Sequence, residues 1–336
     1  MTKSPSIRVD VPFELPSRGS WPETWHVFDE ESADAILMAW AAERPLLVRG
    51  EPGTGKSQLA RAAAEELGRL FIPEVVHART QPQDLQWRFD PIGRLGEAQA
   101  AGLARAGGTG AQDPAAGEGP TIDPLDPRRF LNPGPLWWAF DWNSAIEQHE
   151  RFSRHKLYKP EQPAGWSPPR GCVVLIDEID KAESDVPNSL LETLGNRSFS
   201  VPWVERVIGQ DPATPSPLVI ITTNEERELP AAFLRRCLVL NLEMPANLEE
   251  WLIRRGRIHN PDPSRCPDST LTLAAKQFIE DRTEAKRQGG TAPGQAEYLD
   301  LLRAVTTLET DPERQRKRLD SLSRFALRKY AKQDSP

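Results

Sequence analysis

One short stretch carries the residue types best suited to chemistry on phosphates. Residues 50–57 read Gly-Glu-Pro-Gly-Thr-Gly-Lys-Ser. Glycine has no Cβ, so the backbone N–H groups of such a loop can turn inward onto phosphate oxygens. The ammonium of Lys56 can reach the β- and γ-phosphates of a nucleotide, and the hydroxyl of Ser57 can bind Mg²⁺. The alternative interpretation is a plain glycine–proline turn.

The residues on either side of this loop predict the elements that would position it. An apolar run at 45–48 precedes the loop, and an alanine- and leucine-rich segment at 57–67 follows it. Strand, glycine loop and helix form the context of a phosphate-binding P-loop, and the helix start adds unpaired N–H groups and a partial positive charge. The predicted phosphate-binding residues are Gly50, Glu51, Pro52, Gly53, Thr54, Gly55, Lys56 and Ser57.

An acidic pair closes a second apolar run. Asp177 and Glu178 directly follow residues 172–176, a continuous apolar segment of strand length. Mg²⁺ takes only one or two protein oxygens beside water and phosphate, so Ser57 and Asp177 suffice as metal ligands. Glu178 is placed to polarise the attacking water. Without a P-loop in the same chain, such a pair is often only a solvated turn.

Two further polar positions complete the candidate site. Asn224 follows the apolar run 218–221, where its amide can hold the attacking water or the γ-phosphate; a simple turn residue is the alternative. Arg235 and Arg236 precede the apolar run 237–240. An arginine aimed at the γ-phosphate of a neighbouring subunit is worth ~10³–10⁵ in turnover. We assign this role to Arg236, with Arg235 beside it; a surface salt bridge is the alternative for one of the two.

The pattern of elements predicts an α/β fold with a helical addition. Apolar runs alternate with helical segments, which indicates a doubly wound parallel sheet with its ligand at the carboxyl ends of the strands. The expected organisation is an irregular arm at 1–24, a nucleotide-binding core at 25–245 and a helical lid at 246–336. Within the core, residues 199–207 alternate as one arm of a hairpin would. The expected strands are 45–48, 70–76, 172–176, 218–221 and 237–240.

The long insert at about 81–171 is harder to interpret. Residues 100–127 are rich in Gly, Ala, Pro and Asp, so they bury too little surface to offset the entropy of ordering, and we expect them to be mobile. Residues 136–142 form a dense aromatic patch that contains three tryptophans. The patch is either a satellite core beneath the loops or an exposed surface for a partner.

Composition limits the classes of partner. The 336 residues carry a formal net charge of -7, which argues against nucleic acid as the main partner. Cys172, Cys237 and Cys266 lack metal-ligand spacing and are expected to be small core residues in a reducing compartment. The sequence shows no signal peptide and no run near the ~20 apolar residues of a membrane span, so we expect a cytoplasmic protein.

The motifs taken together resemble those of the AAA+ ATPases, and more narrowly of their MoxR-like branch. The resemblance spans about residues 44–308 and rests on four stretches in the order of the family: 50–57, 175–182, 186–202 and 223–237. It implies Walker A at 50–57, Walker B at Asp177 and Glu178, sensor 1 at Asn224 and the arginine finger at Arg236. It also implies ATP and Mg²⁺ as cofactors, a homohexameric ring, chaperone-like remodelling of a protein, and often a von Willebrand factor A-type partner.

Two departures from the family pattern accompany the resemblance. The insert at 81–171 is longer than usual, and no arginine starts the helix expected at 295–308, where sensor 2 would lie; Arg303 is a weak candidate for that role. Other functions stay open: a nucleic-acid-linked or GTP-dependent motor, or a nucleotide-gated scaffold in a defence system. An ordinary kinase fits least, since a sensor asparagine and a trans-acting arginine would have no purpose there.

Overall fold

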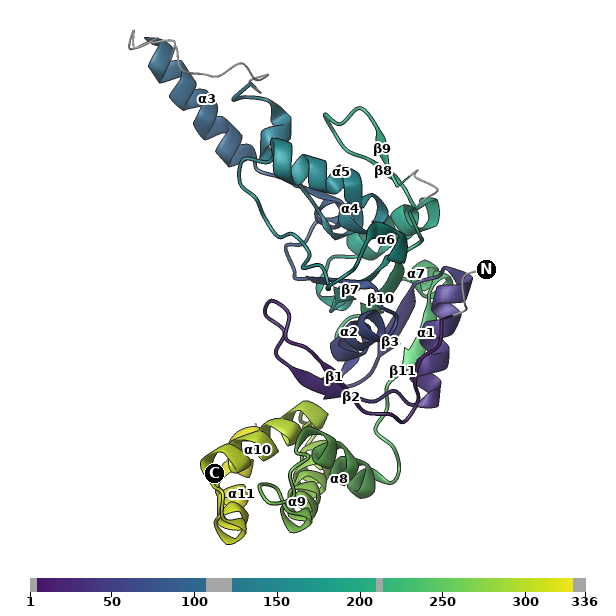
Figure 1. The fold of residues 1–336 in the computed structure, drawn as a ribbon, viewed down its shortest axis with the longest axis vertical. Helices are drawn as coiled ribbons and strands as arrows, with labels where there is room; N and C mark the ends of the chain where they lie inside the picture. Colours follow the sequence, from purple (N-terminus) through teal and green to yellow (C-terminus); the bar gives the residue numbers. More distant parts are fainter. Residues whose placement is uncertain (1–4, 107–122, 210–213, 329–336) are drawn as a thin grey trace.

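The protein is organised around one five-stranded parallel sheet. A computed structural model describes residues 5–106, 123–209 and 214–328. The strand order is β11-β3-β10-β7-β4, and every neighbouring pair runs parallel. This confirms the predicted doubly wound parallel sheet (Figure 1). The strands are β3 (Leu46–Arg49), β4 (Leu70–Val75), β7 (Cys172–Asp177), β10 (Leu218–Thr222) and β11 (Leu238–Asn241).

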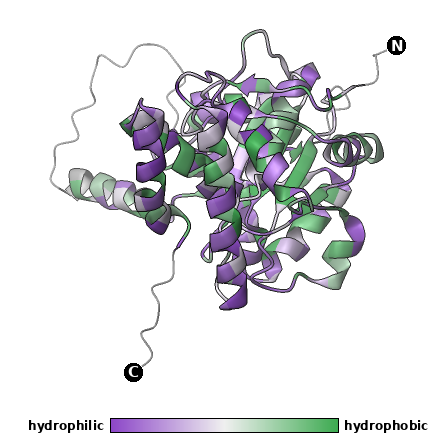
Figure 2. Ribbon diagram, turned by 90° about the horizontal axis from the view of Figure 1, so that it is seen from below, coloured by the Kyte–Doolittle hydropathy of each residue, from purple (hydrophilic) through white to green (hydrophobic). Residues whose placement is uncertain are grey.

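Helices cover both faces of the sheet because successive side chains of a strand point to opposite faces. In β7, Val173 and Leu175 pack with helices α1 and α2 and with the N-terminal residues, whereas Val174 and Ile176 pack with α4, α6 and α7. In Figure 2 the central strands are mainly hydrophobic, while the C-terminal helices carry many hydrophilic residues. The covering helices are α1 (Glu30–Ala42), α2 (Lys56–Glu66), α4 (Pro135–Phe140), α6 (Asp185–Asn196) and α7 (Ala231–Arg236).

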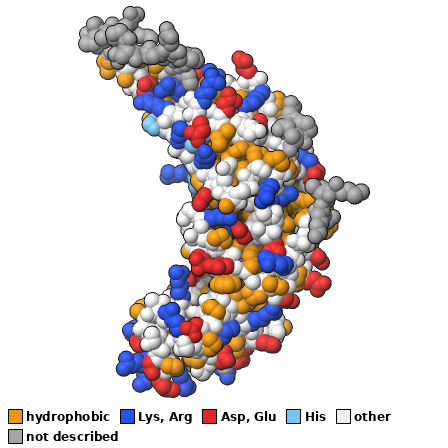
Figure 3. All heavy atoms as spheres, in the orientation of Figure 1, with side chains coloured by type: hydrophobic (Ala, Val, Ile, Leu, Met, Phe, Trp, Pro, Cys, Tyr) orange, Lys and Arg blue, Asp and Glu red, His pale blue; other side chains and the backbone are white. Residues whose placement is uncertain are grey.

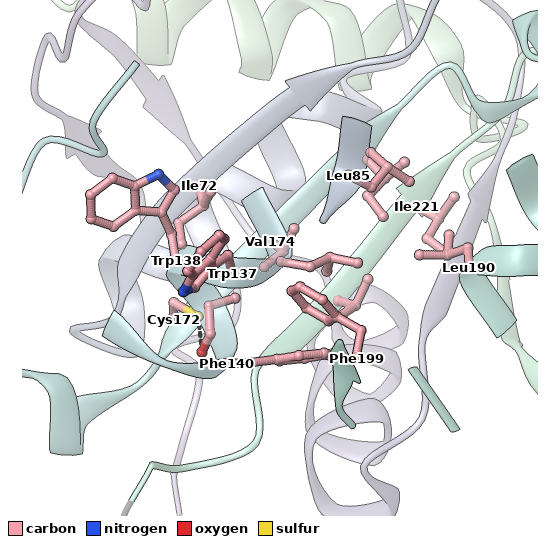
Figure 4. Close-up of a cluster of buried hydrophobic side chains, with 14 of the residues drawn as sticks. Ile72, Leu85, Trp137, Trp138, Phe140, Cys172, Val174, Leu190, Phe199 and Ile221 are labelled. Carbon is pink, nitrogen blue, oxygen red and sulfur yellow. Dashed lines mark hydrogen bonds between the residues drawn. The ribbon is translucent and has the colours of Figure 1, made fainter. Parts of the chain in front are cut away.

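The aromatic patch of the insert belongs to the main core. Trp137 and Trp138 are 1% and 2% exposed, and they pack in the same cluster as Ile72 and Val174 of the sheet (Figure 4). The indole N–H of Trp137 donates to Ser144 Oγ over 2.7 Å. The patch is therefore neither a satellite core nor an exposed surface for a partner, and the reason is that α4 lies directly on β4 and β7.

The rest of the insert combines small elements with one projecting helix. Helix α3 leaves the body of the molecule (Figure 1), and Ile92 and Leu103 on it are 82% and 74% exposed. The segment expected to be mobile begins inside this helix, and its residues 107–122 lie outside the described part of the chain. The elements are β5 (Trp87–Phe89), α3 (Pro91–Ala106), β6 (Leu131–Pro133) and α5 (Trp142–Glu147), with β5 and β6 paired antiparallel.

Two hairpins lie outside the main sheet. The segment expected to be an irregular arm contains strand β1 (Phe13–Leu15), which pairs antiparallel with β2 (Thr24–His26). Leu15 and Phe28 are fully buried against the α1–α2 face, and this burial orders the arm. Strands β8 (Phe199–Ser200) and β9 (Val207–Ile208) pair antiparallel, so the segment expected to be one arm of a hairpin holds one of its strands and the start of the other.

Four helices after the sheet pack around a core of their own. Leu252, Phe278 and Leu302 are fully buried in this third cluster, which confirms the helical C-terminal region. The helices form one end of the molecule, opposite α3 (Figure 1). The last of them begins at Pro312, and the side chain of Asp311 caps its first turn. They are α8 (Leu248–His259), α9 (Asp268–Arg287), α10 (Gln295–Leu308) and α11 (Pro312–Ala326).

Candidate functional site

The glycine loop at 50–57 connects β3 to α2 with its N–H groups open. Helix α2 begins after Gly55, which has a φ of 93° and offers no side chain to cap the first turn. Gly50 and Gly53 also have positive φ, and a Cβ at Gly50 would lie 2.5 Å from the carbonyl oxygen of Leu242. Because the helix N-terminus combines free N–H groups with the positive end of its dipole, the loop can bind phosphate oxygens.

Lys56 lies over the loop. Its Nζ donates to the carbonyl oxygens of Gly50 at 2.7 Å and Glu51 at 3.0 Å. Burial lowers the pKa of Lys56, and nearby carboxylates, Asp177 first among them, act in the opposite direction. The lysine is thus fixed within the phosphate-binding loop by contacts to its own backbone.

Ser57 and Asp177, the two metal ligands expected from the sequence, meet across the end of the sheet. The hydroxyl of Ser57 lies 2.8 and 2.9 Å from the two carboxylate oxygens of Asp177. Thr222, at the end of the neighbouring strand β10, donates to Asp177 Oδ1 over 2.5 Å. Its hydroxyl also accepts the N–H of Glu178 at 2.9 Å. Thr222 is fully buried and therefore fixes both members of the acidic pair.

Glu178 and Asn224 are also brought together. The amide Nδ2 of Asn224 donates to Glu178 Oε1 at 3.2 Å, and Lys181 Nζ donates to Oε2 at 2.6 Å. This hydrogen bond raises the pKa of Lys181. Glu178 has a φ of 60°, a left-handed conformation that a non-glycine residue adopts at a cost of about 1–3 kcal/mol. The surrounding bonds hold this strained turn and aim the carboxylate at Asn224.

Asp180 holds the loop that carries Asn224. Its carboxylate is 2% exposed and accepts the backbone N–H groups of Asn224 at 3.4 Å and Glu226 at 2.9 Å. Sequence reasoning missed the roles of Thr222 and Asp180. The signals were a hydroxyl residue ending a buried strand and a third acid just after the pair, but only the sheet register brings them to their partners.

The oxygen atoms at this edge suit Mg²⁺. Within the described residues, no group of three or more His, Cys, Asp or Glu is placed to hold a metal ion. A metal here would therefore depend on one carboxylate, one hydroxyl, water and phosphate, which is the usual Mg²⁺ arrangement in nucleotide sites. Asp177 and Ser57 supply that carboxylate and hydroxyl on adjacent elements. The residues present thus fit the ion.

A cavity of about 1180 Å³ extends from the loop between the arm, the end of β11 and the C-terminal helices. Its lining includes Gly53, His26, Arg255, His259 and Arg303. Burial lowers the pKa of His26 to about 3 and of His259 to about 4, and the charge of Arg255 adds to both shifts. Both histidines are therefore neutral at pH 7, and the cavity is large enough for the rest of a nucleotide.

The C-terminal helices contact the glycine loop directly. Arg282 of α9, 9% exposed, pairs with Glu51 and donates to the carbonyl oxygen of Pro293 at 2.7 Å. Lys286 pairs with the same Glu51 carboxylate at 2.9 Å. At the start of α10 the N–H of Ala296 donates to Gly53 O over 3.1 Å. These contacts join the helical region to the loop, and their members on the helical side, Arg282, Lys286 and Ala296, had not been selected by sequence reasoning.

Arg236 lies away from the glycine loop of its own chain. Arg235 and Arg236 end α7, next to the amino ends of β3 and β10, where they border a separate cavity of about 380 Å³. Both side chains are exposed, and within the described part of the chain neither forms an ion pair or a side-chain hydrogen bond. The structure thus gathers the other predicted site residues at the carboxyl ends of the strands, whereas Arg236 lies beside the amino ends.

A family model for the AAA domain of the dynein-related subfamily matches residues 45–237. The chain belongs to this family. It is an AAA+ ATPase, and its P-loop, sheet and helical C-terminal region are those of the fold. The match covers the acidic pair Asp177 and Glu178 as well as Asn224 and Arg236. It stops before the C-terminal helices.

Solved structures with a similar fold are distant from this ATPase in sequence. A candidate ATPase from Cytophaga hutchinsonii is 13% identical with a TM-score of 0.37, over 88% of this chain and 79% of the other. A point mutant of RuvB from Thermotoga maritima is 14% identical with a TM-score of 0.46, over 88% and 69%. At this level of identity and TM-score, neither similarity bears on the activity of this chain. No curated protein matches the sequence.

The described residues include no helix that is long and apolar enough to cross a membrane.

The three cysteines are free and buried, as expected. Burial raises the pKa of the Cys172 thiol to about 12, which leaves it unreactive.

Proposed function

We propose that this AAA+ protein hydrolyses ATP with Mg²⁺ in an oligomeric ring and uses the cycle to remodel or activate a protein partner. The observation that carries the proposal is the division of the machinery between two edges of the sheet. Ser57, Asp177, Glu178 and Asn224 lie together at the carboxyl ends of the strands. The exposed Arg236 lies beside the amino ends. Because this arginine lies away from the phosphate site of its own chain, its position supports action on a neighbouring subunit.

The residues divide the work as follows. The N–H groups of the loop and Lys56 hold the phosphates, and Asp177 and Ser57 would hold the metal, which neutralises charge on the transferred phosphoryl group. Glu178 orients the attacking water and accepts its proton, while Asn224 fixes the position of the Glu178 carboxylate. Arg236 from the next subunit would stabilise charge on the γ-phosphate.

The assignment to the MoxR-like branch rests on the motif order and on the β8–β9 hairpin that precedes Asn224. That assignment suggests a homohexamer and a von Willebrand factor A-type partner, in the cytoplasm.

On the face shown in Figure 3, Lys and Arg are interspersed with acidic side chains, so that face offers no continuous basic patch for nucleic acid. The division into an arm, a core with an insert and a lid is part of the same proposal.

Turnover of single variants tests the cis half of the site. Glu178→Gln should bind ATP with near-normal affinity and lose turnover, because the amide keeps the shape of the carboxylate but accepts no proton. Lys56→Ala should lose affinity for ATP. Undiminished turnover by Glu178→Gln, or normal binding by Lys56→Ala, contradicts the assigned roles.

Mixed assemblies test the trans half. Arg236→Ala retains an intact nucleotide site, and Lys56→Ala retains an intact arginine. Mixing the two inactive variants should therefore restore turnover at the interfaces that combine both intact halves. No recovery at any ratio contradicts action in trans, and stimulation by DNA or a preference for GTP over ATP favours the motor alternatives instead.

A further inference from the structure

Arg44, between α1 and β3, contacts the end of the helix that carries the exposed arginine pair. Its guanidinium donates to three consecutive backbone carbonyls at the end of α7. Nε reaches the oxygen of Arg236 at 3.1 Å, and Nη2 reaches those of Arg235 at 2.8 Å and Cys237 at 3.2 Å. These carbonyls belong to the arginine pair itself and to the residue that follows it.

Helix α7 needs such support. It has six residues, too few to be stable alone, and the last carbonyls of any helix lack partners within it. A cation at a helix C-terminus satisfies those carbonyls and interacts favourably with the helix dipole. Two residues after the helix, Leu238 donates its N–H to Pro45 O over 2.8 Å, so the chain continues directly into the β11–β3 ladder. Arg44 therefore fixes the turn between the helix and the sheet.

We propose that Arg44 is a positioning residue for Arg235 and Arg236, and that it supports hydrolysis in the neighbouring subunit without touching the nucleotide. This inference rests on the proposed function, in which Arg236 acts in trans. A planar guanidinium holds the three carbonyls with donors fixed in one fork, whereas the ammonium of lysine is a compact group whose donors rotate. The orientation of Arg236 then depends on the shape of the Arg44 side chain as well as its charge.

Arg197 supplies a matched control. It borders the same cavity of about 380 Å³ as Arg44 and is also exposed. Its guanidinium pairs with Glu43 and has no bond to α7 among the described contacts. Arg197→Gln therefore removes the same charge from the same region and leaves the turn after α7 intact.

The test compares Arg44→Gln, Arg44→Lys, Arg197→Gln and Arg236→Ala for ATP affinity, KM and kcat. For Arg44→Gln we expect unchanged ATP affinity and KM, with kcat lower by roughly 10- to 100-fold, since small misplacement of a catalytic group has effects of this order. Arg44→Lys should be intermediate and Arg197→Gln normal. If Arg44→Gln does not fold, Arg44→Lys carries the test, with reduced kcat at unchanged KM expected.

Mixing experiments separate positioning from a general structural role. Arg44→Gln should regain turnover when it is mixed with Lys56→Ala, as is expected of Arg236→Ala, because Lys56→Ala supplies an intact arginine. Adding Arg44→Gln to Arg236→Ala should lower kcat no further. A normal kcat for both Arg44 variants, additive losses in the double variant, or no recovery with Lys56→Ala overturns the inference. Normal turnover by Arg236→Ala instead refutes the trans arginine of the proposed function.

Discussion

Removing the hydroxyl of Thr222 should disrupt the acidic pair without touching either acid. Thr222→Val conserves the shape of a fully buried side chain. It deletes the 2.5 Å bond donated to Asp177 Oδ1 and the 2.9 Å bond accepted from the N–H of Glu178. The first loss leaves Asp177 free to turn from Ser57. The second leaves a backbone donor unpaired at a residue already in a left-handed conformation.

The magnitude follows from these two bonds. A hydrogen bond to a charged group contributes about 1.5–3 kcal/mol, and an orphaned buried donor costs about 1–3 kcal/mol. The two share one hydroxyl and are not additive, so we expect the free energy of unfolding to fall by about 3 kcal/mol. Because Asp177 and Glu178 both lose a fixed orientation, kcat should fall by roughly 10²-fold, with a higher Mg²⁺ requirement.

Urea unfolding and Mg²⁺-dependent ATPase measurements check this prediction. Thr222→Ser keeps the hydroxyl and should retain most of the activity. Thr223→Val is a second control, since Thr223 is 1% exposed and its hydroxyl accepts the N–H of Glu225 at 2.9 Å, with no described bond to either acid of the pair. If Thr222→Val unfolds within about 0.5 kcal/mol of wild type and keeps its kcat, Thr222 does not fix the pair, and the reasoning is refuted.

Three other predictions concern the glycine loop and the cavity beside it. Arg282→Met should loosen the helical region from the loop, because it removes the buried partner of Glu51. Limited proteolysis should then cleave faster between α7 and α8, and Lys286→Met is a milder control. Equal digestion rates for Arg282→Met and the wild type contradict this prediction. Gly53→Ala should weaken ATP binding at least 10-fold, because φ is 76° and a Cβ would lie 2.8 Å from Glu297 Oε2; unchanged affinity in a titration would show that the loop relaxes at little cost. Lowering the pH should destabilise the protein through His26 and His259: burial keeps their folded-state pKa values near 3 and 4, below the unfolded value of 6.5, so stability is complete above pH 6.5 and falls on acidification by up to about 1.4 kcal/mol per pH unit per histidine. His26→Phe should flatten that pH dependence, and an unchanged slope between pH 6 and 4 would count against the burial of a neutral His26.

The glycine loop and the strands could be predicted because their signals are local. Residues 50–57 combine glycines, Lys56 and Ser57 at fixed spacing. Apolar runs of strand length are typical of parallel strands that are buried on both faces. The positions of Asp177 and Asn224 follow from the same logic, since each residue ends such a run. Strand ends that lie next to each other bring their polar residues together, as the 3.2 Å hydrogen bond between Asn224 and Glu178 shows.

The insert and the arm could not be predicted in the same way. The aromatic residues 136–142 have an apolar surface that fits a core or a partner equally well, and only the placement of α4 on β4 and β7 distinguishes the two. The arm lacks a strong strand pattern, and its order comes from burial of Leu15 in the cluster that α1 and α2 form on one face of the sheet. Irregular segments take their structure from what they pack on.

The sequence by itself determined the phosphate-binding loop, the parallel sheet and the identity of the acids that face it, because these depend on residue type and short-range spacing. Only the tertiary structure decided which side chains hold them in place: Thr222 on Asp177, Asp180 beneath Asn224, Arg282 on Glu51 and Arg44 on the end of α7. Each of these contacts, between residues 44 to 231 positions apart in the chain, depends on strand order and helix packing. A single hydrogen bond at such separation leaves no periodic or compositional trace in a sequence.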